Sequence, residues 1–265
     1  RILLLATQET GKDMENKEAL YNAVLHLGDN GSILGHRLGE LCGHGPVLEQ
    51  DIAMTNIALD LIGQARLYLQ YAGKLSGKDL TEDDLAYKRD VMDYKNFLIT
   101  ELQNGDFADT IARQFTYDTF HLLFLRGLSD SKDETLAAIA KKSIKEVTYH
   151  QRWSCEWVIR LGDGTDESHE KMQRALNDIW MWTDELFTQS EDEGSLVESG
   201  MLPDTSLLKD QWLNEIKRIV EEAALDMPED QPMQEGGKTG YHTEYLGFIL
   251  AEMQYLPRAY PDATW

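Results

Sequence analysis

The chain has 265 residues, of which 42% are hydrophobic, enough for one sizeable core. Its 47 acidic residues outnumber the 25 lysines and arginines, so the formal net charge is −22. Such a chain repels nucleic acids and anionic membranes, and neither is expected as a partner. No apolar run approaches the roughly 20 residues that span a bilayer. Two cysteines are too few for a disulfide framework. We therefore expect a cytoplasmic protein in which Cys42 and Cys155 are packed, reduced thiols.

The first residues, RILLL, form a short apolar run without the full pattern of a signal peptide. Met14 has the character of a natural start. We therefore expect residues 1–15 to be an N-terminal extension or a remnant of cloning, and residues 16–265 to form a single domain.

The apolar pattern is helical almost throughout, and the six prolines are spread thinly. No segment alternates polar and apolar residues over the length of a strand, so a sheet is not expected. The connection between the second and third helices is charged and expected to be part helical. The expected helices span about 16–42, 47–74, 109–128, 133–161, 168–189, 205–225 and 243–255.

Two long helices, a long crossover and two more long helices form the layout of a ferritin-like four-helix bundle. The sequence therefore predicts an all-α protein with this bundle at its centre and additional C-terminal helices around it. Bundles of this kind that hold two irons take one Glu from each of two helices and a Glu-x-x-His pair from each of the other two. The carboxylates bind the hard cations, and imidazoles complete the ligand set.

The chain contains no Glu-x-x-His pair. Its nearest approach is EVTYH, Glu146–His150, in which Tyr149 stands at the histidine position. Moving one residue along a helix turns the side chain by about 100°. His150 is therefore expected to point away from the position that a di-iron centre requires. Asp118-x-x-His121 has the right spacing, but it has no second pair to complete a site.

Three acids remain at positions where such a bundle carries ligands: Asp60, Asp118 and Glu146. Asp118 interrupts an apolar helical face, so its carboxyl group is expected to be buried and to need a partner. Lys142, one turn before Glu146, is the nearest candidate cation. We predict a vestigial polar cluster of Asp60, Asp118, Glu146, Lys142 and His150, with no catalytic residue and no metal in this chain.

The fourth carboxylate position has no acid. Counting back from Asp60 by the interval that separates Asp118 from Glu146 gives Ser32. Ser32 lies on a ridge of small residues, which favours close contact with another helix over metal binding. The other members of the ridge are Gly28, Gly35 and Gly39.

Several long blocks occur in the order typical of one family. They include "LGDNGSILGHRLGELCGHGPVLEQDIAMTNIALDLIGQAR", "KSIKEVTYHQRWS" and "GGKTGYHTEYLGFILAEMQYLPRAYP". In these blocks the chain resembles the C subunits of bacterial phenylacetyl-CoA epoxidases, over about residues 20–265. The resemblance implies a ferritin-like fold and a role in aerobic phenylacetate degradation. It also implies that the di-iron centre lies in a sister subunit, that this chain is its non-catalytic structural partner, and that a separate reductase supplies electrons from NADPH.

Two alternatives stay open at this point. The first is a self-sufficient ferritin-like oxidase that binds metal through Asp60, Asp118 and Glu146, with His150 or His121. The second is a free-standing helical scaffold of another pathway.

If the chain is a structural subunit, it associates with the di-iron subunit as a heterodimer or a heterotetramer. The candidate contacts are the small-residue ridge with Leu38 and Leu41, and aromatic or apolar residues near the C-terminus. The latter are Tyr245, Phe248, Met253 and Tyr255.

Overall fold

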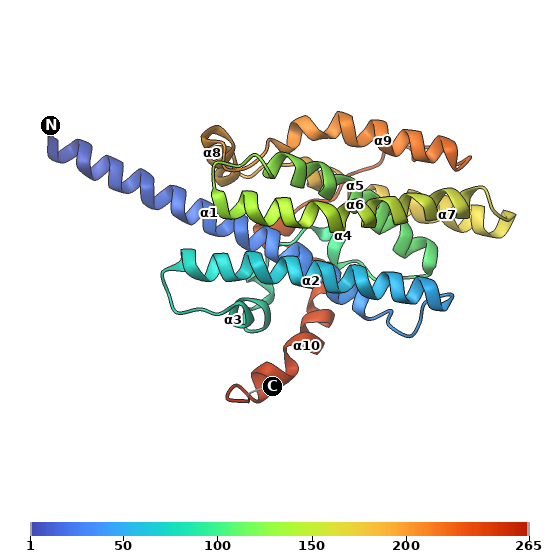
Figure 1. Ribbon diagram of the computed structural model, residues 1–265, viewed down its shortest axis with the longest axis horizontal. Helices are drawn as coiled ribbons and strands as arrows, with labels where there is room; N and C mark the ends of the chain where they lie inside the picture. The colour runs from blue at the N-terminus through green and yellow to red at the C-terminus, as the bar shows by residue number, and fades with distance from the viewer. Residues whose placement is uncertain (1, 264–265) are drawn as a thin grey trace.

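The computed structural model describes residues 2–263, except for the side chains of residues 2–15 and of Glu191. This part of the chain contains helices and no strand (Figure 1), so the expected all-α class is confirmed. The prediction for residues 1–15 lies outside the described side chains. None of the helices found here combines the length and the apolar character that a bilayer crossing needs.

Seven helices exceed three turns: α1 (Ile2–Gly39), α2 (Leu48–Ser76), α5 (Phe107–Leu128), α6 (Glu134–Gly162), α7 (Asp166–Trp180), α9 (Lys209–Glu222) and α10 (Glu244–Ala259). The shorter helices are α3 (Glu82–Tyr87), α4 (Leu98–Glu101) and α8 (Glu191–Ser199), with 3-10 turns η1 (Val91–Asp93), η2 (Asp184–Phe187), η3 (Thr205–Leu208) and η4 (Gly237–Thr239).

The long helices form two hairpins. Residues 40–47 join α1 to α2, and residues 129–133 join α5 to α6. The hairpins meet where α2 packs on α6, and residues 77–106 cross between them through α3, η1 and α4 (Figure 1). The crossover is thus part helical, as predicted.

Glycines on α1 allow α2 to approach closely. A Cβ atom built on Gly31 would lie 2.9 Å from the backbone oxygen of Leu61, and one on Gly35 would lie 3.1 Å from that of Ala58. The predicted close contact is therefore made, but with this chain's own α2. Leu38 is also fully buried in the core, so Gly28, Gly35 and Leu38 do not serve a partner helix as expected; at Gly39 and Leu41, which this chain leaves uncovered or half-buried, the partner contact stays a prediction.

We expect Gly31→Ala to destabilise the protein by about 1–3 kcal/mol, because the added methyl group forces two backbones apart. Gly63 is the matched control, since it lies inside α2 with no atom within 4 Å of an added Cβ. Gly63→Ala should stabilise the fold by about 0.5–1 kcal/mol through helix propensity. Urea unfolding of both variants measures the difference. Equal effects would show that the two helices can separate without cost.

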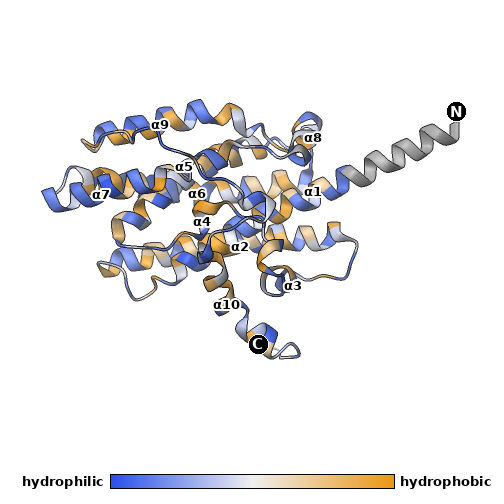
Figure 2. Cartoon of the chain, turned by 180° about the vertical axis from the view of Figure 1, so that it is seen from behind, coloured by the Kyte–Doolittle hydropathy of each residue, from blue (hydrophilic) through white to orange (hydrophobic). Residues whose placement is uncertain are grey.

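Helix α5 lies at the centre of the molecule. Nearly every residue from Ala108 to Leu122 is buried, as expected of a helix covered on all sides. It packs on α6, α7 and α9, and Trp212 of α9 donates a hydrogen bond from Nε1 to the backbone oxygen of Thr116 at 2.9 Å. Hydrophobic and hydrophilic residues alternate along α7 and α9 at the margin of the body (Figure 2). Core packing therefore orients these two helices.

Three predicted features differ from the structure. The helix expected over 168–189 ends at Trp180, because the chain turns there so that the carboxylate of Glu185 can accept backbone N–H groups from other segments. Helix α8 is not among the expected helices, although a capping box and a left-handed glycine, Gly200, mark its two ends. Cys42, expected to be packed, is exposed because α1 ends before it; Cys155 is buried.

Helix α10 projects from the side of the body formed by α1 and α2 (Figure 1). A small second core attaches it to α1 and to the crossover. This core consists of Ile33, Tyr94, Leu246, Ile249 and Leu250. The opposite face of α10 carries Phe248 and Tyr255, which are 64% and 66% exposed.

Candidate functional site

Two hydrogen bonds form a polar ladder between α2 and α6. Asp60 Oδ2 accepts from His150 Nε2 at 3.0 Å, and Gln64 Nε2 donates to Glu146 Oε2 at 2.9 Å. Each helix contributes residues four apart, which lie on one helical face. The higher number on α2 meets the lower number on α6, so the two helices run antiparallel. The ladder places Asp60, Glu146 and His150 in one seam.

Asp118 of α5 is completely buried next to this seam. Gln114 Nε2 lies 3.5 Å from its Oδ1, and no described residue bonds its Oδ2. Burial raises the pKa of Asp118 to about 7, while His150, the Ser154 hydroxyl and Arg113 lower it to a smaller extent. The predicted burial of this acid is therefore found, and its carboxyl group holds a proton over part of the physiological range.

Lys142 does not neutralise the buried acid. It is exposed and forms no ion pair with the described residues. Lys142 precedes Glu146 by four residues, so the two side chains lie about 40° apart around the helix axis. Glu146 itself is only half-buried, and Lys142 lies further toward the solvent. The prediction that Lys142 belongs to the cluster is therefore wrong.

His150 is fully buried and points into the seam, while Tyr149 is 39% exposed. The side chain of His150 faces Asp60 of α2, while the expectation that it points away from the position required by a di-iron centre stays a prediction. Position 150 faces α2 because Val147 and Ser154, one turn away on either side, are buried on the same face of α6.

The donor groups do not form a metal-binding set. No three His, Cys, Asp or Glu side chains within the described part of the chain lie close enough to share an ion. Asp60 and His150 bond to each other, and Glu146 bonds to an amide. Ser32 is buried, and Gly63, at the remaining ligand position on α2, has no side chain. The residues therefore do not fit a di-iron centre.

The folded-state pKa of Asp118 lies above its unfolded value of about 3.9. Protonation of this group thus stabilises the fold fully below about pH 4, and the contribution is lost as the pH rises through about 7. We expect Asp118→Asn to gain stability relative to the parent between about pH 4 and pH 8, by up to about 4 kcal/mol. Urea unfolding at several pH values measures this gain. Asp79→Asn, at an exposed position, is the control and should show no such trend.

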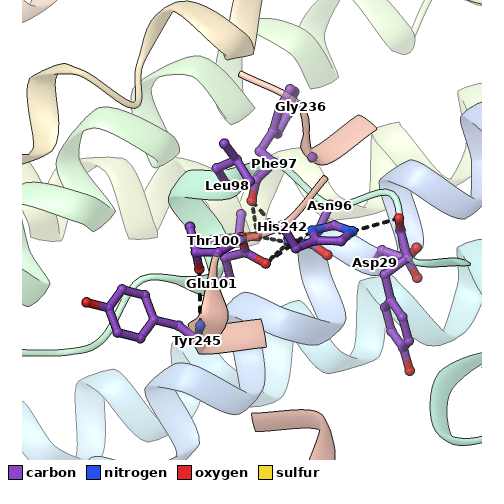
Figure 3. A network of polar contacts seen from close by, with 12 residues as sticks. Asp29, Asn96, Phe97, Leu98, Thr100, Glu101, Gly236, His242 and Tyr245 are labelled. Carbon is purple, nitrogen blue, oxygen red and sulfur yellow. Dashed lines mark hydrogen bonds and ion pairs between the residues drawn. The ribbon is translucent and has the colours of Figure 1, made fainter. Parts of the chain in front are cut away.

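A second polar network lies at residues that the sequence pattern does not single out (Figure 3). Glu101, at the end of α4, is completely buried, and its Oε1 accepts the backbone N–H of Thr243 at 2.8 Å. His242 Nδ1 lies 3.2 Å from Glu101 Oε2, and His242 Nε2 donates to the backbone oxygen of Tyr94. The network fixes the start of α10 against the crossover.

Glu185 of η2 holds the same segments together from the other side. Its Oε2 accepts the N–H of Leu98 at 2.8 Å, and its Oε1 accepts those of Gly236 and Gly237 at 2.9 and 2.7 Å. Burial raises the pKa of Glu185, and the three backbone N–H groups lower it. The carboxylate therefore replaces the hydrogen bonds that regular secondary structure would give these N–H groups.

Asp29 anchors the crossover to α1. Its carboxylate is fully buried, pairs with the guanidinium of Arg89 and accepts the N–H of Lys95 at 2.9 Å. No periodic pattern marks Glu101 or Glu185, since both lie in short helical turns. Of these three acids, only Asp29 could be identified from the sequence, because it lies between apolar residues of a long helix.

Comparison with known proteins defines the class to which this helical body and its polar seam belong. The family model of phenylacetic acid catabolic proteins matches residues 6–265, so the chain belongs to this family. The match includes residues 6–15, which the resemblance in the sequence blocks does not cover.

One relative is the C subunit of the 1,2-phenylacetyl-CoA epoxidase of Escherichia coli strain K12. It is 49% identical over 242 residues, which cover 91% of this chain and 97% of the relative. The resemblance expected from the sequence blocks is confirmed.

Proposed function

We propose that this chain is a non-catalytic structural subunit of a multicomponent phenylacetyl-CoA epoxidase in aerobic phenylacetate degradation. The observation that carries the proposal is the α2–α6 ladder. In it, the acids at ligand positions bond to side chains of the same protein. The similarity to the C subunit of the Escherichia coli enzyme over nearly its whole length supports the assignment.

The arrangement of the helices supports a ferritin-like four-helix bundle of α1, α2, α5 and α6. Two helical hairpins joined by a long crossover are one of the established layouts of such bundles. In this proposal the di-iron centre lies in a sister subunit, a separate reductase delivers the electrons, and the complex is cytoplasmic. The present chain supports its catalytic partner through contact.

In this proposal, the sister subunit binds where apolar side chains are exposed. On α2, Leu48, Ile52 and Leu59 are 69%, 52% and 62% exposed and share one helical face. On α10, the exposed apolar residues are Phe248, Tyr255 and Leu256. Obligate interfaces are comparatively apolar and aromatic residues anchor their centres, which fits these two helices.

The isolated chain is expected to bind no stoichiometric iron, because its donor groups do not form a ligand set. Reconstitution with ferrous iron followed by desalting and elemental analysis measures this. Tight, saturable uptake of about two irons per chain, with an oxo-bridged absorption band, would favour the self-sufficient oxidase instead.

Co-expression with the di-iron subunit is expected to give one complex in size-exclusion chromatography. Phe248→Asp and Ile52→Asp should each weaken it at least tenfold, because a charge is then buried in an apolar contact. Leu207→Asp is the matched control, since Leu207 is 71% exposed on η3. A di-iron subunit that elutes alone and epoxidises phenylacetyl-CoA at full rate would contradict the structural role.

A further inference from the structure

A small cavity of about 30 Å³ lies between α1, α5 and α8, apart from the α2–α6 ladder. Its walls are largely aromatic and include Phe97, Phe120 and Phe124. The cavity has room for about two water molecules. Because α1 and α5 make little direct contact here, α8 and the residues around it close the space between them.

Three polar side chains line this cavity without a partner: Tyr68, Tyr117 and His121. They are 3%, 3% and 8% exposed. Nδ1 of His121 is buried without a partner among the described residues, and neither tyrosine hydroxyl forms a hydrogen bond with them. The rings of Tyr117 and His121 lie 5.3 Å apart, so these groups surround one space. Buried polar groups are nearly always satisfied, which indicates that a bound molecule satisfies these.

All three groups are uncharged at neutral pH. Burial raises the pKa of both tyrosines and lowers the pKa of His121 to about 3, with a smaller lowering by His150. A neutral imidazole offers one donor and one acceptor, and each phenol offers both. These three groups offer hydrogen bonds but no charge, and the charged residues Lys238 and Glu193 in the cavity lining neutralise each other, so the lining favours a neutral ligand.

The rim of the cavity suggests how molecules enter. Lys238 Nζ lies 2.8 Å from Glu193 Oε2, and this ion pair borders both the cavity and an outer groove of about 300 Å³. His26 and Ala23 also line both spaces. The ion pair therefore lies on the boundary between the cavity and the groove.

We propose that this cavity is a binding site for small uncharged hydrogen-bonding molecules. It holds about two ordered waters in the free protein, and these exchange with an alcohol of two or three heavy atoms, such as ethanol. The alternative is a dry apolar cavity, which would accept an inert gas.

Thermal unfolding tests the proposal through the sign of the change in Tm when a tyrosine hydroxyl group is removed. If a bound molecule satisfies the hydroxyl groups, Tyr68→Phe and Tyr117→Phe each lose a hydrogen bond and lower Tm by about 2–4 °C. If the hydroxyl groups are truly unpaired, the same substitutions remove a buried unsatisfied group, and Tm stays equal or rises. Tyr241→Phe, at a site 72% exposed, should leave Tm unchanged.

Crystallography of the full chain supplies the direct test. We expect water density within hydrogen-bonding distance of the three side chains, replaced by ethanol after a soak, and no xenon at this site under pressure. Xenon in the cavity, or a cavity without density in both crystals, would overturn the proposal. If water density remains after the ethanol soak, the proposed exchange of water for alcohol is wrong.

Discussion

The fold depends on one constraint: backbone N–H groups in irregular segments are buried beside α1 and must be satisfied. Carboxylates meet this need. Asp29, Glu101 and Glu185 accept N–H groups from the crossover and from the loop before α10. Buried acids are costly unless bonded in this way. The crossover, the C-terminal loop and α10 therefore owe their positions to three side chains whose charge would otherwise oppose folding.

The sequence predicts the parts of this fold that a periodic pattern of apolar residues can encode. Long amphipathic stretches identify α1, α2, α5 and α6, because each apolar stripe spans several turns. The same pattern identifies Asp118 as a buried acid, since it interrupts such a stripe. Glu101 and Glu185 escape this reasoning, because a helical turn of four residues has no period. Their roles depend on which distant N–H groups the tertiary fold brings to them.

The composition of the site can be predicted more accurately than its geometry. Asp60, Glu146 and His150 lie in one seam, but the spacing of the ligand positions does not predict that His150 bonds to Asp60 and that Glu146 bonds to Gln64. Rotation around α6 is decided by the buried neighbours of His150, which ligand spacing does not describe. Lys142 is close to Glu146 in sequence only. Because Lys142 is exposed, the seam does not extend from Glu146 by a further turn toward the start of α6.

The ladder also changes how the polar interior should be understood. A metal-binding bundle keeps its carboxylates free for a cation, while Asp60 and Glu146 here are engaged by groups on the facing helix. Such hydrogen bonds fix the register of α2 against α6. The seam thus stays polar, and its side chains help to align the two helices.

The attachment of the C-terminal loop has a consequence for the order of folding during synthesis. Ribosomes release the N-terminal part of a chain first, and domains fold as units once complete. Glu101 and Glu185 accept N–H groups from Gly236, Gly237 and Thr243, which are synthesised after both acids. The nascent chain therefore carries Glu101 in the crossover and Glu185 in η2 without these partners until residues 236–243 have been made. These contacts form only after residues 236–243 have left the ribosome.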